Sequence, residues 1–106
     1  MKIYIAGKIT GLPKHQYTAK FKAAEIEHNA AGHNTVNPCR LGIPDTATTE
    51  QALLVCLTHL RQCDAIYLLA DWQDSPGAVI ERQFASDHGL EIIYADHETA
   101  LIHQIA

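Results

Sequence analysis

Short apolar runs alternate with longer amphipathic segments along this chain. Residues 3–6, 65–70 and 92–94 are apolar runs without charged interruptions, a pattern typical of strands that are buried on both faces. A shorter run at residues 34–36 is a fourth candidate strand. Glycine or polar turn residues bound each run, so the pattern predicts several short, buried strands.

Three helices are predicted between these strands. Residues 14–31 carry apolar side chains at helical spacing. Thr48 followed by Gln51 is a capping-box signature for the start of a second helix. Ser75 suits the N-cap of a third helix and Pro76 its first position, where the missing N–H costs nothing. This third helix is expected to end near residue 88.

Alternating strands and helices predict a single α/β domain. The expected architecture is a flavodoxin- or Rossmann-like three-layer sandwich, with a parallel sheet of about four to five strands and helices on both faces. A short further helix is expected from about residue 98. Because 106 residues give room for one core, residues 1–106 are expected to form one domain.

The strand-to-helix loops of such a sheet all lie at its carboxyl edge. Here these loops are residues 7–13, 37–47, 71–76 and 95–97. The glycines, prolines and polar residues of the chain concentrate in them, so a binding site is expected at this edge.

Charge and cysteine content exclude several classes of function. The net charge of −4 provides no overall basic field, so a nucleic acid polymer is not an expected partner. The apolar run at residues 3–6 is too short for a signal peptide or a membrane span, so a cytoplasmic protein without a membrane partner is expected. Cys39, Cys56 and Cys63 lack C-x-x-C spacing, and no metal site is predicted. Cys56 and Cys63 are interpreted as buried core residues.

Glu81 carries the strongest chemical signal of the chain. It lies in the second turn of the helix that Ser75 begins, and the partial positive charge of a helix N-terminus favours an ionised carboxylate nearby. Gly77, one turn earlier on the same face, leaves open space. Such a carboxylate could attack an anomeric carbon. The alternative is a solvated glutamate that pairs with Arg82 or a nearby lysine.

Four residues around this helix start are candidate contacts for a small molecule. Asp74 and Ser75, with the free N–H groups of the first turn, could bind a phosphate, or they could cap the helix without any ligand. Asp71 follows a strand at the active edge and could hydrogen-bond a base or donate a proton to it. Trp72 could stack on a base, cover the sheet edge or lie in a subunit contact.

The loop after the first strand supplies further candidates: Gly7, Lys8, Ile9 and Gly11. Gly-Lys-x-Thr is similar to part of a P-loop, but the full Walker A pattern is missing, so an NTPase is excluded. The glycines still allow close backbone approach to a ligand. Lys8 is either an anion partner or a surface lysine. His97, which follows the last strand, is another candidate at the same edge.

Two motifs carry a resemblance to a known family. Residues 4–11 fit the pattern Y-x-x-G-x-I-x-G, and residues 75–81 fit S-x-G-x-x-x-E. Together they resemble the nucleoside 2-deoxyribosyltransferase superfamily, and more narrowly its 2'-deoxynucleoside 5'-phosphate N-hydrolase branch. Several residues are also similar to the small bacterial and phage family called domain of unknown function 4406: Trp72, Ser75, Gly77, Ala78, Glu81, Ala85 and Gly89.

The resemblance implies roles for four residues. Glu81 falls on the nucleophile that takes the 2-deoxyribosyl group from the base, and Tyr4 falls near a tyrosine that orients this carboxylate. Ser75 falls where the phosphate hydrolases carry a serine for the 5'-phosphate and the transferases an aspartate for the 5'-hydroxyl. Asp71 corresponds to the aspartate that handles the base. Members of this family complete each site from a neighbouring subunit, so a homo-oligomer is implied.

Taken with the resemblance, the sequence predicts cleavage or transfer at the N-glycosidic bond of a (deoxy)nucleoside 5'-monophosphate or nucleoside. Glu81 is the predicted nucleophile, and no metal or organic cofactor is expected. Two alternatives stay open. One is a non-catalytic nucleotide-binding or sensing module of the same fold. The other is a structural or partner-binding domain in which Glu81 is solvated.

Overall fold

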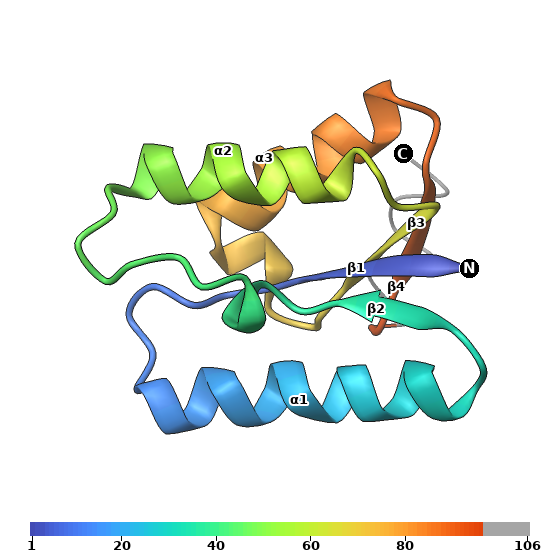
Figure 1. Cartoon of the computed structure of the whole chain (residues 1–106), viewed down its shortest axis with the longest axis horizontal. Coiled ribbons are helices and arrows are strands. Elements are labelled where there is room, and N and C mark those ends of the chain that lie inside the picture. Colours follow the sequence, from blue (N-terminus) through green and yellow to red (C-terminus); the bar gives the residue numbers. More distant parts are fainter. Residues whose placement is uncertain (97–106) are drawn as a thin grey trace.

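The structure, a computed structural model, describes residues 1–96 and contains one four-stranded parallel sheet (Figure 1). The strand order is β2-β1-β3-β4, and each neighbouring pair is parallel. The strands are β1 (Lys2–Ala6), β2 (Asn34–Val36), β3 (Ala65–Leu68) and β4 (Glu91–Tyr94). All four lie at the predicted places in the chain.

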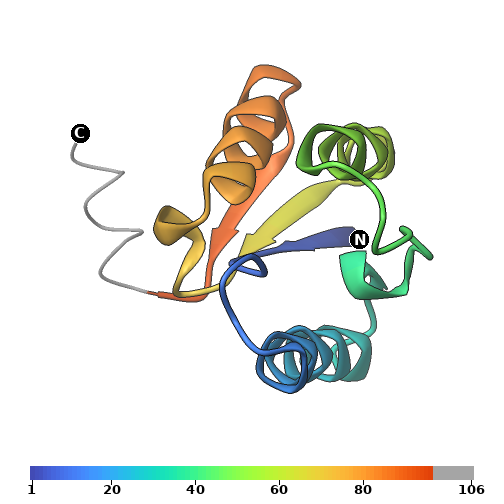
Figure 2. The same ribbon diagram turned by 90° about the vertical axis from the view of Figure 1, so that its left-hand side faces the viewer.

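Three α-helices pack on this sheet: α1 (Lys14–Ala30), α2 (Thr49–Leu60) and α3 (Pro76–Asp87). Figure 2 shows α1 on one face and α2 with α3 on the other. The predicted α/β sandwich with helices on both faces is therefore confirmed. Two short 3-10 helices were not predicted: η1 (Pro38–Arg40) and η2 (Trp72–Asp74).

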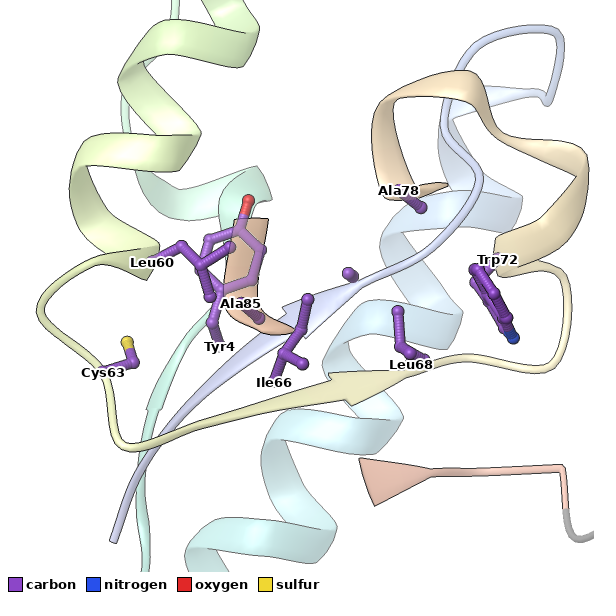
Figure 3. Close-up of a cluster of buried hydrophobic side chains, with 9 residues drawn as sticks. Tyr4, Leu60, Cys63, Ile66, Leu68, Trp72, Ala78 and Ala85 are labelled. Atoms are coloured by element: carbon purple, nitrogen blue, oxygen red, sulfur yellow. The ribbon is translucent and has the colours of Figure 1, made fainter. Parts of the chain in front are cut away.

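The core divides along the two faces of β1, because successive side chains of a strand point to opposite sides. Ile5 packs with Phe21 of α1 on one face. Tyr4 and Ala6 pack on the other face, beneath α2 and α3. Figure 3 shows Tyr4 on the same side of the sheet as Ile66, with its ring among the side chains of this second cluster.

Local capping signals begin both helices of the second face. Thr48 Oγ1 accepts the N–H of Gln51 at 3.0 Å, and the Gln51 side chain accepts the N–H of Thr48 at 2.9 Å. Ser75 Oγ accepts the N–H of Ala78 at 3.2 Å, and Pro76 follows Ser75. Both predicted helix starts are confirmed.

Two predictions at the C-terminus, the helix from residue 98 and the candidate His97, lie outside the described residues. Among the helices of residues 1–96, none has the length and apolar character needed to cross a membrane.

Close packing after β1 is predicted to require a glycine at position 7, because a side chain there has no space. A Cβ at this position would lie 2.8 Å from Leu69 Cδ1 and 3.2 Å from Asp71 Oδ1. Gly7→Ala should therefore lower the free energy of unfolding by about 1–3 kcal/mol, measured by chemical denaturation. Gly77→Ala is the matched control, because its new Cβ would meet only Ser75 Oγ, at 3.9 Å. Equal stability of the two variants would contradict this packing.

Candidate active site

A pocket of about 490 Å³ opens at the carboxyl edge of the sheet. The chain runs from β1 to β2 on one side and from β3 to β4 on the other, so the loops after β1 and β3 diverge. Open parallel sheets bind ligands at such a switch point. Residues 7–10 form one wall of the pocket, and the start of α3 forms a second. The N-terminal half of α2, with the loop before it, forms the third wall.

Glu81 lines this pocket, although it is only 7% exposed. It belongs to the buried stripe of α3 together with Ala78 and Ala85, at spacings of three and four residues that place them on one helical face. Tyr4, which is fully buried, donates its hydroxyl proton to Glu81 Oε2. The central strand and α3 together therefore hold one oxygen of the carboxylate in place.

Burial raises the pKa of Glu81 from 4.5 to about 7, because the ionised form loses its hydration. The hydrogen bond from Tyr4 opposes this rise by stabilising the carboxylate. Burial, and then the charge of Glu81, raise the pKa of Tyr4 well above 10, so its hydroxyl stays protonated and remains a donor. Near neutral pH Glu81 is therefore divided between its acid and carboxylate forms. Neither a fully ionised nor a solvated glutamate fits this environment.

The polar groups of the pocket lie on its loops. Lys8 faces a pocket that also contains the carboxylates of Asp45 and Asp74. In the first turn of α3, Pro76 has no N–H, and Ser75 accepts the N–H groups of Ala78 and Val79, which leaves the N–H of Gly77 for a ligand. Seven predicted site residues line this one pocket: Gly7, Lys8, Ile9, Asp74, Ser75, Gly77 and Glu81.

Asp71 does not line the pocket. Its Oδ1 accepts the backbone N–H of Lys8 at 3.0 Å, and its Oδ2 pairs with Nζ of Lys20 on α1. The carboxylate therefore joins the end of β3 to the loop after β1 and to α1. The sequence analysis expected Asp71 to contact the base, but these contacts direct its carboxylate away from the pocket. They hold in place the loop that carries Lys8.

Trp72 and Gly11 also lie outside the pocket walls. Trp72 is 3% exposed and belongs to the core cluster drawn in Figure 3. Its ring centroid lies 5.9 Å from that of Tyr94. A ring buried there is not available to stack on a base, and this position fits the alternative that it covers the sheet. Gly11 has φ of 88°, a left-handed conformation that glycine adopts easily, in the turn before α1.

Residues 1–94 match a protein family described as domain of unknown function (DUF4406). The chain belongs to this family. The matched residues of this DUF4406 domain include both sequence motifs and all the residues that line the pocket. A search of curated proteins finds no match.

Solved structures of nucleoside enzymes are similar in fold to the DUF4406 domain. A 2-desoxiribosyltransferase from Leishmania mexicana aligns with a TM-score of 0.69 and 18% identity over 88% of this chain and 62% of that one. A CMP N-glycosidase from Clostridium botulinum gives 0.63 and 16%, covering 100% and 83% of the two chains. A 2-deoxyribosyltransferase from Bacillus psychrosaccharolyticus gives 0.66 and 20%, covering 89% and 71%. At these identities the likeness shows the fold, as the resemblance predicted.

The wall formed by α2 was not predicted. Thr48 correctly marked the start of the helix, but its capping box does not show which side chains face the pocket. The structure places Thr49 and Cys56, two turns apart, on the pocket side. Cys56 was interpreted as a buried core residue; it packs against the core cluster but is half-buried and also lines the pocket wall. Cys63, beyond the end of α2, is buried in the core as expected.

Glu81→Gln is predicted to stabilise the protein increasingly as the pH rises. A raised folded-state pKa means that the folded wild type holds an extra proton between about pH 4.5 and pH 7, so its stability falls as pH increases through this window. Glutamine carries no such titration. By about pH 9 the variant should have gained about 3 kcal/mol relative to wild type, compared with their difference near pH 4.

Urea denaturation of both proteins across this pH range measures the effect. Glu91→Gln is the control, because Glu91 is an exposed glutamate of β4. A stability difference between Glu81→Gln and wild type that stays constant with pH would show that the folded protein does not raise the pKa of Glu81.

Proposed function

We propose that this protein cleaves the N-glycosidic bond of a nucleoside or a nucleoside 5'-monophosphate, with water or a second base as acceptor. The observation that carries this proposal is a buried Glu81 that lines a pocket and is oriented by the Tyr4 hydroxyl. A glutamate with a purely structural role has no need of a pocket, and about 490 Å³ is within the usual range for small-molecule sites. The fold shared with deoxyribosyltransferases and an N-glycosidase supports the same chemistry.

In the proposed reaction, a carboxylate oxygen of Glu81 attacks C1' on the face opposite the base. The C1'–N bond breaks, its electron pair leaves with the base, and the base takes up a proton from water or from a pocket acid. Water then attacks C1' of the glycosyl-enzyme, which releases the sugar, restores the carboxylate and gives up a proton. In a transferase, a second base replaces this water. Tyr4 holds the attacking carboxylate in position.

The pocket offers partial support for a 5'-phosphate. Lys8, the Ser75 hydroxyl and the N–H of Gly77 are groups that suit an anion. Asp45 and Asp74 line the same pocket, and their charges favour an uncharged 5'-hydroxyl. We therefore include both phosphorylated and unphosphorylated nucleosides in the proposed substrate class.

A homo-oligomer and a cytoplasmic location stay predictions. The two helices of the second face expose large apolar side chains that a neighbouring subunit would cover. These are Leu54 and Val55 on α2, and Val79 and Ile80 on α3.

Free-base release from a panel of deoxy- and ribonucleosides and their 5'-monophosphates tests the proposed reaction. Chromatography of each reaction, with and without an acceptor base, should show release by the wild type. Glu81→Ala should lower the rate by at least about 10³-fold, because it removes the nucleophile. The wild-type rate should rise with pH through about 7 as Glu81 ionises.

Two controls make this result interpretable. Glu91→Ala, a change on the exposed side of β4, should keep the wild-type rate. Glu81→Ala should still bind nucleotide, which would show that its pocket is intact. Nucleotide binding by the wild type without base release from any substrate would favour the binding or sensing module instead.

Ser75→Ala is predicted to lower the activity on nucleoside monophosphates more than the activity on nucleosides. Its hydroxyl lines the pocket and is the proposed phosphate contact, so kcat/KM should fall by about 10-fold for monophosphates and change little for nucleosides. Nucleosides serve as the internal control, because loss of the helix cap acts on both substrate types equally. An equal loss on both would assign Ser75 to capping alone.

A further inference from the structure

The pocket wall that carries Lys8 is held by a side chain at the point where the sheet ends. Leu69 donates its N–H to the carbonyl of Ala6 at 2.9 Å, which continues the parallel ladder of β1 and β3 by one residue. The next bond of this ladder would run from the N–H of Lys8 to the carbonyl of Leu69. The chain turns there instead, and the Leu69 carbonyl accepts the N–H of Trp72 at 3.0 Å. Asp71 Oδ1 accepts the N–H of Lys8, also at 3.0 Å, so a carboxylate replaces a strand carbonyl.

Lys20 binds the other oxygen of this carboxylate. It reaches Asp71 Oδ2 from α1, which lies on the opposite face of the sheet from α2 and α3 (Figure 2). The side chains of Lys20 and Asp71 are 24% and 30% exposed, so this ion pair is partly shielded from solvent. One carboxylate oxygen is therefore fixed on a backbone N–H, and the other is paired with an ammonium group that balances its charge.

The ammonium group of Lys8 has no such partner. In the part of the chain that the structure describes, no salt bridge involves Lys8, although Asp45 and Asp74 line the same pocket. Asp71 contacts the backbone of Lys8, and the flexible four-carbon stem of a lysine is long enough to fold back onto such a carboxylate. Lys20 prevents this pairing, because it already occupies the second oxygen of Asp71.

We propose that Lys20 is a positioning residue for an anion contact in the pocket. It holds Asp71 on the backbone of the loop after β1, and it thereby leaves the ammonium group of Lys8 for a phosphate group of the ligand. This arrangement favours nucleoside 5'-monophosphates over nucleosides, a consequence that rests on the proposed function. Its consequence for the N–H of Lys8 does not, because Asp71 makes its two contacts whether or not the protein is an enzyme.

Hydrogen exchange of backbone amides, followed by NMR in isotope-labelled protein, tests the effect on the loop. In Lys20→Met the Asp71 carboxylate should turn to the Lys8 ammonium. The N–H of Lys8 should then exchange at least about 5-fold faster, because it loses its acceptor. Lys20→Arg should keep the slow exchange, and the N–H of Leu69 is the internal control, since its bond to Ala6 does not involve Asp71. An unchanged exchange rate at Lys8 in Lys20→Met would overturn the proposal.

Calorimetry tests the effect on the ligand, with each 5'-monophosphate of the panel compared with its own nucleoside. All proteins carry Glu81→Gln, so that no turnover takes place. Lys20→Met should weaken the binding of monophosphates about 5-fold and change the binding of nucleosides less than about 2-fold. Lys22→Met is the matched control, because it removes an exposed lysine of the same helix and changes the net charge equally.

A second substitution separates positioning from a general loss of positive charge. The unpaired Asp71 is the expected cause of the loss in Lys20→Met. Adding Asp71→Asn should therefore restore the affinity for monophosphates to within about 2-fold of the protein with Lys20 and Asp71 in place, since asparagine keeps an oxygen that accepts the N–H of Lys8. If Lys20→Met does not fold, Lys20→Gln carries the same comparison.

Three binding results would contradict the proposal. Monophosphates that bind no better than nucleosides to the protein with Lys20 in place would remove the anion contact. Equal affinities in Lys20→Met and Lys22→Met would remove Lys20 from it. A double variant as weak as Lys20→Met would assign the effect to long-range charge. The expected binding results without base release by the wild type would count against the proposed function alone.

Discussion

The buried hydrogen bond between Tyr4 and Glu81 is the interaction on which the candidate site depends. It joins the central strand to α3, so core packing sets the position of the carboxylate and no mobile loop is needed to place it. A buried carboxylate without a donor would cost on the order of several kcal/mol. Because Tyr4 is fully buried, its hydroxyl has no access to water, and each group satisfies the other.

A second carboxylate, that of Asp71, organises the loop beside the pocket. It accepts the N–H of Lys8 and pairs with Lys20, so the end of β3 is joined to the loop after β1 and to α1. Gly7 allows this close approach, because any side chain there would collide with Leu69. The two acidic residues are therefore used differently: Asp71, just after β3, stabilises the loop, and Glu81, on α3, lines the pocket.

Local signals predicted the fold well, and they predicted the site only in part. The N-cap of α3 at Ser75 depends on neighbouring residues, so a single sequence reveals it. The partner of Glu81 lies 77 positions away, and the lysine that turns Asp71 from the pocket lies 51 positions away. Such contacts leave no periodic trace in one sequence, and only the family resemblance pointed to Tyr4 as the partner of Glu81. Trp72 follows β3 as predicted, but it lies in the short η2 and its ring packs in the core.

The hydrogen bond between Tyr4 and Glu81 also affects the balance between the reactivity of the carboxylate in the proposed reaction and the stability of the fold. A carboxylate in a dry setting has lost the hydration that weakens it as a nucleophile, and it is also harder to ionise there. The Tyr4 donor partly reverses the rise in the pKa of Glu81 and leaves the value at about 7. Near this pH a small change in the surroundings of Glu81 alters its ionised fraction most. The pH range in which Glu81 ionises, as the proposed reaction requires, is therefore also the range in which its burial destabilises the fold.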